Sequence, residues 1–171
     1  VNGQYRGIYA LKEDINVTFF AQKTGSAEKN ITMTEDPALH ATDLYDLADY
    51  CDNNDLTVQE HYDYVTARLD TDSFIDWLIL QGYCCNADVA GNVTWFRSAE
   101  TGNRWQPVLQ DLDNGFYYRE GFLNVLNPES PQQYAVIATA LMKNDAFRMA
   151  LPVTKDIFRR WEITEDELFE T

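Results

Sequence analysis

The stretch NADVAGNVTWFRSAETGNRWQPVLQDLDNGF, residues 86–116, is typical of a β-hairpin with polar residues at both ends. Residues 100–103, Glu-Thr-Gly-Asn, are turn formers. Antiparallel pairing around this turn places residues 93–96 opposite residues 105–109. The loop before the first strand is therefore expected to lie beside the loop that follows the second strand.

Five polar residues mark the two ends of this hairpin. They are Asn86, Asp88, Asn92, Asp111 and Asp113. Carboxylates that lie close together repel one another unless a cation neutralises them, and hard cations prefer oxygen ligands. The pattern therefore predicts one acidic cluster that binds a hard metal ion. Asp and Asn also favour turns and helix caps, so turn formation is the alternative reason for their presence.

The composition indicates one globular domain over residues 1–171. Of the 171 residues, 45% are hydrophobic and 13% aromatic, which is enough to bury a core. The formal net charge of −15 opposes binding to a phosphate backbone, so no nucleic-acid partner is expected. Since no apolar run reaches the roughly 18 residues of a membrane span, we expect no membrane insertion in this segment.

The cysteines and histidines do not form a recognisable metal or disulfide pattern. Cys51 stands alone and Cys84 and Cys85 are adjacent, so the spaced pairs of a zinc site or a disulfide framework are missing. We expect all three cysteines to be small buried hydrophobic residues on helices. His40 and His61 are isolated in sequence and indicate neither a nucleophile's base nor a zinc ligand.

The beginning and the end of the chain suggest that elements are missing. Asn2-Gly3 is a hairpin turn signal, and residues 5–11 alternate as a strand does, but no strand precedes the turn. Residues 164–167 are a capping box that opens a helix just before the sequence stops. We therefore expect a domain truncated at both ends.

Helical periodicity begins near Thr42 and recurs along the rest of the chain. The second helix is predicted to start at a capping box, residues 57–60 (Thr-Val-Gln-Glu), and the helix at residues 73–85 has an apolar face wide enough for deep burial. The predicted helices cover residues 42–51, 57–69, 73–85, 132–142 and 155–161. Residues 17–20 are of undetermined type, and residues 22–36 and 115–131 are predicted as loops.

Four motifs in this chain occur in an order that resembles the CotH kinase-like proteins, a family named for a spore-coat protein. Residues 2–13 have the form NGxYxGxYxLxE. Residues 70–92 hold an aspartate, an aromatic-rich helix and the pattern NxDxxxN. Residues 105–116 read W...L.DLDxGF, and residues 141–148 read LxxNxxFR. The resemblance extends over nearly the whole chain.

The resemblance implies an α+β, kinase-like fold: a mostly helical lobe, a β-hairpin that carries the metal-site loops, and a partial N-terminal sheet. It also implies an atypical protein kinase that transfers phosphate from ATP, with Mg²⁺ or Mn²⁺, to a hydroxyl group of a protein substrate. By this resemblance Asp88 matches the catalytic-loop aspartate, Asn92 a metal-binding amide and Asp111 the metal-binding aspartate after the hairpin. These residue types meet the needs of phosphoryl transfer. Asp113 is either a second metal ligand or a cap of the turn that follows.

The nucleotide side of the expected site is less complete in the sequence, which has no glycine-rich phosphate loop. Lys12 lies on a predicted strand and is either the phosphate-binding lysine or a solvated residue at the strand end. Glu13 matches an acidic position of the family and either orients a lysine or a metal, or simply ends the strand. Arg97 either contacts phosphate or pairs with a carboxylate. The segment alone is expected to be inactive.

Two other functions stay open at this point. A catalytically silent interaction domain of a surface or spore coat would keep the fold and lack the chemistry. A calcium-stabilised structural module would use the same acidic residues to hold Ca²⁺. By resemblance alone, the expected location is extracellular, at a cell surface or in a spore coat.

Overall fold

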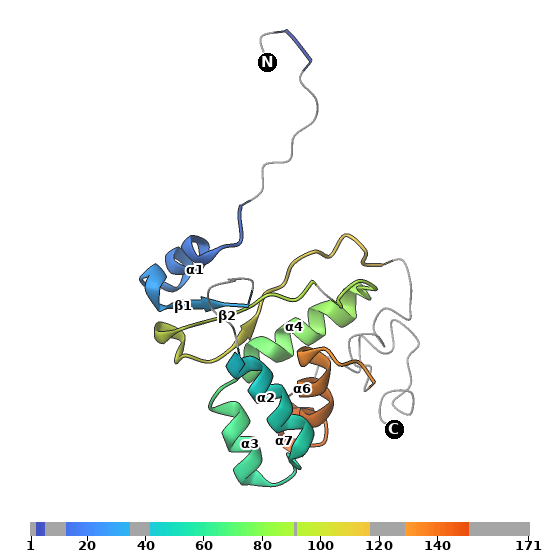
Figure 1. Ribbon diagram of the computed structural model, residues 1–171. Helices are drawn as coiled ribbons and strands as arrows, with labels where there is room; N and C mark the ends of the chain where they lie inside the picture. Colours follow the sequence, from blue (N-terminus) through green and yellow to red (C-terminus); the bar gives the residue numbers. More distant parts are fainter. Residues whose placement is uncertain (1–2, 6–12, 35–41, 91, 117–128, 151–171) are drawn as a thin grey trace.

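The computed structural model describes residues 3–5, 13–34, 42–90, 92–116 and 129–150, and within them the chain has an α+β fold. A small three-stranded sheet lies between helix α1 and a larger group of helices (Figure 1). The helices are α1 (Val17–Thr24), α2 (Thr42–Asn53), α3 (Gln59–Thr66), α4 (Thr71–Cys84), α6 (Gln133–Leu141) and α7 (Asp145–Met149). The strands are β1 (Ile31–Met33), β2 (Trp95–Ser98) and β3 (Gln106–Pro107), and two short 3₁₀ turns are η1 (Glu28–Asn30) and η2 (Ala99–Thr101).

The predicted hairpin is confirmed. Strands β2 and β3 pair antiparallel, with Trp95 opposite Pro107, and η2 forms the connection between them. The Val108 N–H donates to the Thr94 carbonyl at 2.8 Å, which carries the same register one step further toward the open end of the hairpin. The Ser98 and Thr101 side chains cap η2, so the turn residues predicted from sequence do form the turn.

The prediction of a loop over residues 22–36 holds for residues 25–27 and is wrong for most of the other described residues. Residues up to Thr24 belong to helix α1, which Asn16 caps by accepting the Phe19 N–H at 3.0 Å. Strand β1 follows and pairs antiparallel with β2, from which it is separated by more than 60 residues of sequence. A strand of three residues gives almost no periodic signal, and its partner here is distant, so local reasoning misses it.

The two faces of β2 bury side chains in two different cores. Phe96 stacks on Phe20 of α1 at 3.9 Å between ring centroids, within the smaller core formed by α1, β1 and β2. Trp95 points to the opposite face, where it contacts Phe74 in the larger core. This alternation is what a strand buried on both faces requires.

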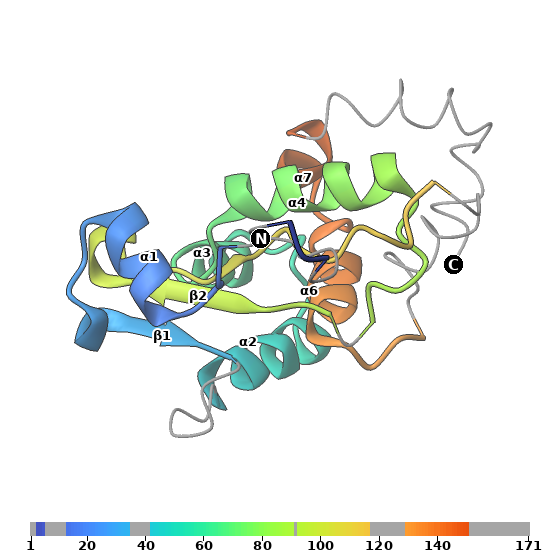
Figure 2. The same ribbon diagram turned by 90° about the horizontal axis from the view of Figure 1, so that it is seen from above.

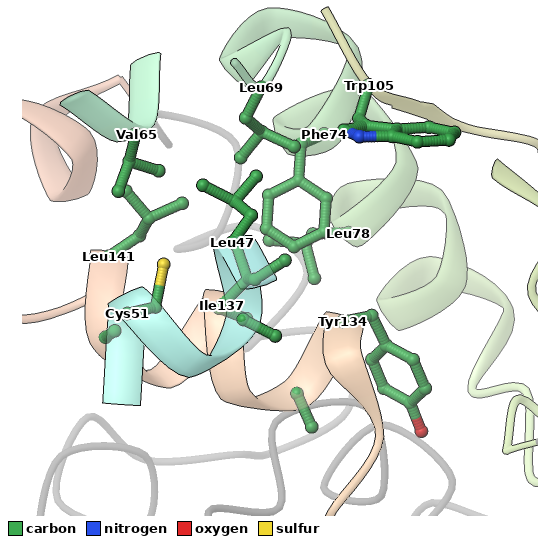
Figure 3. Packing of buried hydrophobic residues seen from close by; sticks show 14 of the residues in the cluster. Leu47, Cys51, Val65, Leu69, Phe74, Leu78, Trp105, Tyr134, Ile137 and Leu141 are labelled. Carbon is green, nitrogen blue, oxygen red and sulfur yellow. The ribbon is translucent and has the colours of Figure 1, made fainter. Parts of the chain in front are cut away.

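The larger core lies among α2, α3, α4, α6 and α7, and the predicted apolar faces of the helices at residues 42–51, 73–85 and 132–142 form it (Figure 3). Leu47 of α2 and Ile137 of α6 meet at its centre, with Phe74 of α4 beside them. Trp105 directly precedes β3 and is buried in this core. Its N–H donates to the Arg68 carbonyl, and its carbonyl accepts the Asp70 N–H. The hairpin and the helices therefore share one buried interior.

The capping box predicted at Thr57 is wrong. Helix α3 begins at Gln59, and its N-cap residue Val58 makes no side-chain capping bond. The Thr57 hydroxyl instead donates to the Asp55 carboxylate at 2.8 Å, and the Thr57 N–H donates to the same oxygen at 3.0 Å. These bonds lower the pKa of the Asp55 carboxyl. Thr57 therefore takes part in a local turn with Asp55, and α3 begins one residue later than a helix capped by Thr57 would.

Several predicted elements lie outside the described residues. These are most of the strand at residues 5–11, most of the loop at residues 115–131, the helix at residues 155–161 and the capping box at residues 164–167. After α6, the Asn144 side chain caps α7 by accepting the N–H groups of Ala146 and Phe147. Across the part of the chain that the structure describes, no helix combines the length and the apolar character needed to cross a membrane.

The three cysteines are buried, as predicted, and none of them is in a disulfide. Cys51 lies on α2 and Cys84 on α4, while Cys85 is the residue at which α4 ends. Burial raises the pKa of the Cys51 thiol from 9.0 to about 12. Only the thiolate reacts readily, and burial also blocks access to the sulfur.

We therefore expect the folded protein to resist thiol reagents. At about pH 8, the thiolate fraction of Cys51 should be lower than that of an ordinary cysteine by roughly three orders of magnitude. Labelling followed by mass spectrometry should show slow reaction of all three thiols in the native protein and rapid reaction in denaturant. Rapid labelling of Cys51 in the native protein would contradict the burial.

Candidate functional site

Helix α4 positions the first of the two polar loops. Its N-terminus is capped by Asp70, which accepts the Ser73 N–H at 3.2 Å, and its buried face includes Phe74, Trp77 and Leu78. It ends at Cys85, which adopts a left-handed conformation with φ 47°. Because the helix is packed along its length, residues 86–92 leave it from a fixed point.

The hairpin positions the second loop against the same helix. The Trp77 indole N–H of α4 donates to the Val108 carbonyl at 3.2 Å, inside the core. Figure 2 shows the yellow segment after β3 running along α4 toward the end of that helix. The Gln110 side chain then donates to the Thr94 hydroxyl at 2.9 Å and to the Asn92 carbonyl at 3.4 Å. These bonds bring residues 110–116 back to the first loop.

The two loops meet, as the hairpin predicts. The Asn114 side-chain amide donates to a carboxylate oxygen of Asp88 at 3.3 Å, and the Asn114 carbonyl accepts the Ala87 N–H at 3.5 Å. The Phe116 N–H donates to the Cys84 carbonyl, which fixes the end of the second loop to the end of α4. Residues separated by more than 20 positions are thus joined by side-chain and main-chain bonds.

Asp88 and Asn92 are bound to each other within the first loop. The Asn92 side-chain amide donates to the Asp88 carbonyl at 2.9 Å, and the Asn92 N–H donates to the Val89 carbonyl at 3.2 Å. The Asp88 side chain is exposed, with Asn114 as its hydrogen-bond donor. Its carboxylate is therefore held at one oxygen and accessible from solvent.

Asp111 and Asp113 are both exposed in the second loop. Asp111 has φ 54°, a left-handed conformation that Asp and Asn tolerate better than most residues. The Asp111 carbonyl accepts a bond from the Asn86 side chain at 3.2 Å. Asp113 lies in a turn that the Gly115 N–H closes by donating to the Leu112 carbonyl at 3.0 Å.

The predicted single acidic cluster is not formed by the described residues, among which no three His, Cys, Asp or Glu side chains lie together as a metal site. The chemistry of the predicted ligands nevertheless fits Mg²⁺ or Mn²⁺, because Asn92, Asp111 and Asp113 would each bind an ion through oxygen. Mg²⁺ is commonly held by one or two carboxylates together with phosphate oxygens and water, and needs no cage of protein ligands. Carboxylates and an amide in the two loops are the kinds of donor that this smaller requirement calls for.

The three residues predicted to contact the nucleotide are in different situations in the structure. Lys12 lies outside the described residues, and Glu13 is exposed just before helix α1. Arg97 of β2 forms an ion pair with Asp43 in the first turn of α2, and its guanidinium lies over the Trp105 ring at 4.7 Å from the centroid. A carboxylate partner for Arg97 was one of the two predicted roles, and this partner comes from a helix rather than from a neighbouring strand.

Sequence reasoning missed two residues that hold the loops together. Gln81 occupies a core position on the apolar face of α4, and Asn114 was considered only as part of a turn. A glutamine at a helix position otherwise filled by apolar residues is a signal of a buried hydrogen bond, because a buried amide must be paired. Asn114 carries no comparable signal, since Asn is common in turns.

Gly115 allows the second loop to approach α4 closely. A Cβ atom at this position would lie 3.0 Å from the Leu112 carbonyl oxygen and 3.1 Å from the Cys84 carbonyl oxygen. Both neighbours are main-chain atoms, so neither can move without shifting the loop or the helix end. The glycine is therefore a requirement of the contact between the two loops.

We expect Gly115→Ala to destabilise the fold by about 1–3 kcal/mol, the usual cost of overpacking. Urea unfolding measures this loss. Gly102→Asn is the matched control, because Asn tolerates the φ of 73° found there and the nearest atom to a Cβ is an Arg104 side-chain nitrogen at 3.6 Å. Equal stability of Gly115→Ala and the native protein would show that the loop does not pack as described.

The comparisons with known proteins give one match. The family model described as CotH kinase protein matches residues 34–170, which include α2, α4, the hairpin and both loops. No match was found among curated proteins or among solved structures.

Proposed function

Because the chain belongs to the CotH kinase family, we propose that it transfers the γ-phosphate of ATP to a hydroxyl group of a protein substrate, with Mg²⁺ or Mn²⁺ as cofactor. The observation that carries this proposal is the meeting of residues 86–92 and 110–116, where the Asn114 amide contacts the Asp88 carboxylate. The type of reaction is inferred from the family, and the location of the site is inferred from the contact between the two loops.

Asp88 is the proposed catalytic residue. Its exposed carboxylate would orient the acceptor hydroxyl and accept its proton, as the catalytic-loop aspartate does in protein kinases. The hydrogen bond from the Asn114 amide limits the rotation of the Asp88 carboxylate and leaves its negative charge in place. A carboxylate both accessible and oriented is what this step requires.

Asp111 and Asn92 are the proposed metal ligands, and Asp113 is a candidate for a second ligand. A bound divalent ion would neutralise charge on the phosphate oxygens. Asp111 and Asp113 are exposed on one loop, while the Asn92 side chain is tied to the adjacent Asp88 carbonyl. The two loops together would hold the ion through carboxylate and amide oxygens.

Lys12 and Glu13 are the proposed contacts on the nucleotide side, and Arg97 is the third residue considered for it. Lys12 would bind phosphate, because it lies on the predicted strand next to Glu13, and Glu13, which matches the acidic position of the family motif at residues 2–13, would orient the lysine or the metal. Of the two roles considered for Arg97, pairing with a carboxylate has the more support, since Asp43 holds it. We further propose that the helices form the larger lobe of a kinase-like fold, and that the protein acts outside the cell, at a cell surface or in a spore coat.

The test uses the protein as its gene encodes it, with γ-labelled ATP, Mg²⁺ or Mn²⁺, and either casein or the protein itself as the acceptor. We expect incorporation of label that requires the divalent ion and is lost on chelation. Calorimetry with ATP and Mn²⁺ should show binding. A folded protein with neither binding nor transfer would overturn the proposal and favour a catalytically silent interaction domain.

If the protein is instead a calcium-stabilised structural module, the same protein sample should give a different result. A calcium-stabilised module would show a higher unfolding temperature with Ca²⁺ alone, by the linkage between binding and stability, and no effect of nucleotide. Stabilisation by Mn²⁺ that increases when ATP is added would support the kinase instead.

A further inference from the structure

The side chain of Asn86 is a buried connection between the two loops. It is 1% exposed, and it directly follows the residue at which α4 ends. Its carbonyl oxygen accepts the Asp88 N–H at 3.2 Å, and its amide nitrogen donates to the Asp111 carbonyl at 3.2 Å. One side chain thus touches the main chain of both proposed acidic site residues, which are 23 positions apart in sequence.

A third bond fixes Asn86 to the helix. Its amide nitrogen also donates to the side-chain carbonyl of Gln81 at 3.0 Å, and Gln81 is likewise 1% exposed. Both N–H bonds of the Asn86 amide and its oxygen are therefore paired. A fully paired buried polar network is rigid, because each group that lost its partner would stay buried and unsatisfied.

Capping of α4 does not explain this side chain. The helix ends with Cys85 in a left-handed conformation, and the Asn86 main-chain N–H donates to the Gln81 carbonyl at 3.2 Å. This C-terminal arrangement uses only the main chain of Asn86, so many other residue types would satisfy it. The three side-chain bonds are additional, and two of them go to the loops.

We propose that Asn86 is a positioning residue: its side chain fixes the main chain of the proposed metal ligand Asp111 relative to that of the catalytic Asp88, and through Asp111 it sets the affinity of the site for the divalent ion. The inference rests on the proposed function for the identity of the ion, and on the hydrogen bonds alone for the connection between the loops. Residues that orient metal ligands through hydrogen bonds commonly change metal affinity or activity by about 10–100-fold when they are replaced.

The variants separate positioning from general stability. Asn86→Ala removes all three bonds, whereas Asn86→Asp keeps an acceptor for the Asp88 N–H and loses the donor to Asp111. Asn144→Ala is the matched control. Asn144 is a second buried asparagine, 7% exposed, and it too makes three side-chain bonds, to the Leu56 carbonyl and to the N–H groups of Ala146 and Phe147.

Two measurements decide the inference. The first is the half-saturating Mn²⁺ concentration with ATP, followed by electron paramagnetic resonance. It should rise by about 10–100-fold in Asn86→Ala and change less than about twofold in Asn144→Ala. The second is amide hydrogen exchange at Asp88, which should become faster in Asn86→Ala and stay slow in both Asn86→Asp and Asn144→Ala, since these two variants retain its acceptor.

The outcomes are distinct. Equal changes in Asn86→Ala and Asn144→Ala would overturn the inference and leave the proposed function standing. If the native protein neither binds Mn²⁺ with ATP nor transfers phosphate, the proposed function fails, and exchange at Asp88 alone decides whether Asn86 orders the loop. If Asn86→Ala does not fold, Gln81→Met replaces it, and an unchanged half-saturating Mn²⁺ concentration in that variant would overturn the inference.

Discussion

Asp111→Asn is expected to reduce phosphate transfer by at least about 10³-fold while the protein remains folded. The substitution replaces a charged metal ligand with a neutral amide of the same shape, and the stabilisation that a bound ion gives to a transition state amounts to several kcal/mol. The Asp111 side chain is exposed, and asparagine tolerates the left-handed φ of 54° found there. The loss should therefore come from the site rather than from the fold.

The measurement is the initial rate of transfer at saturating ATP, together with the thermal unfolding midpoint. Asp113→Asn on the same loop is measured alongside it, since Asp113 is either a second ligand or a turn cap. A loss of transfer comparable to that of Asp111→Asn would identify Asp113 as a ligand, and a small change would identify it as a cap. Full transfer by Asp111→Asn would remove Asp111 from the proposed site.

Asp70→Ala is expected to destabilise the protein by about 2–3 kcal/mol. The carboxylate is 13% exposed and accepts three bonds, from the Ser73 N–H, the Arg104 guanidinium and the Gln106 side chain. Loss of a helix N-cap costs about 1 kcal/mol, and each of the other two bonds contributes a similar or smaller amount. We discount the ion pair with Arg104, because that side chain is 41% exposed and solvent screens the charge.

Urea unfolding with a two-state analysis measures this effect. Asp76→Ala is the control on the same helix, because Asp76 is exposed, and it should change the free energy of unfolding by no more than about 0.5 kcal/mol. The Asp70 substitution should affect phosphate transfer only to the extent that it unfolds the protein. A loss of transfer by the fully folded variant would contradict this structural role.

Asp70 is a motif residue whose role in the structure is to hold the fold together. Asp70 belongs to the sequence pattern by which the chain resembles its family, and a polar residue in such a pattern suggests chemistry. The structure shows that it joins the start of α4 to the second hairpin strand through Arg104 and Gln106. Position in a motif therefore does not distinguish a residue that acts from one that holds the fold.

The sequence by itself determined the hairpin, the main helices and the meeting of the two polar loops. These features follow from periodicities of two and 3.6 residues and from turn residues, all of which are local properties of the chain. It also determined the family, since four motifs in order identify it. The start of α3 was predicted wrongly, because Thr57 bonds to Asp55 in a local turn and the helix begins at Gln59.

Only the tertiary structure decided how the loops are joined. The pairing of β1 with β2, the ion pair between Arg97 and Asp43, and the bonds of Asn86 to Gln81 and Asp111 all link residues through space. Burial makes such bonds specific, because a polar group removed from water must find its partner wherever the packed chain places one. A sequence shows which residues are able to pair, and the packing of the core selects the pairs that form.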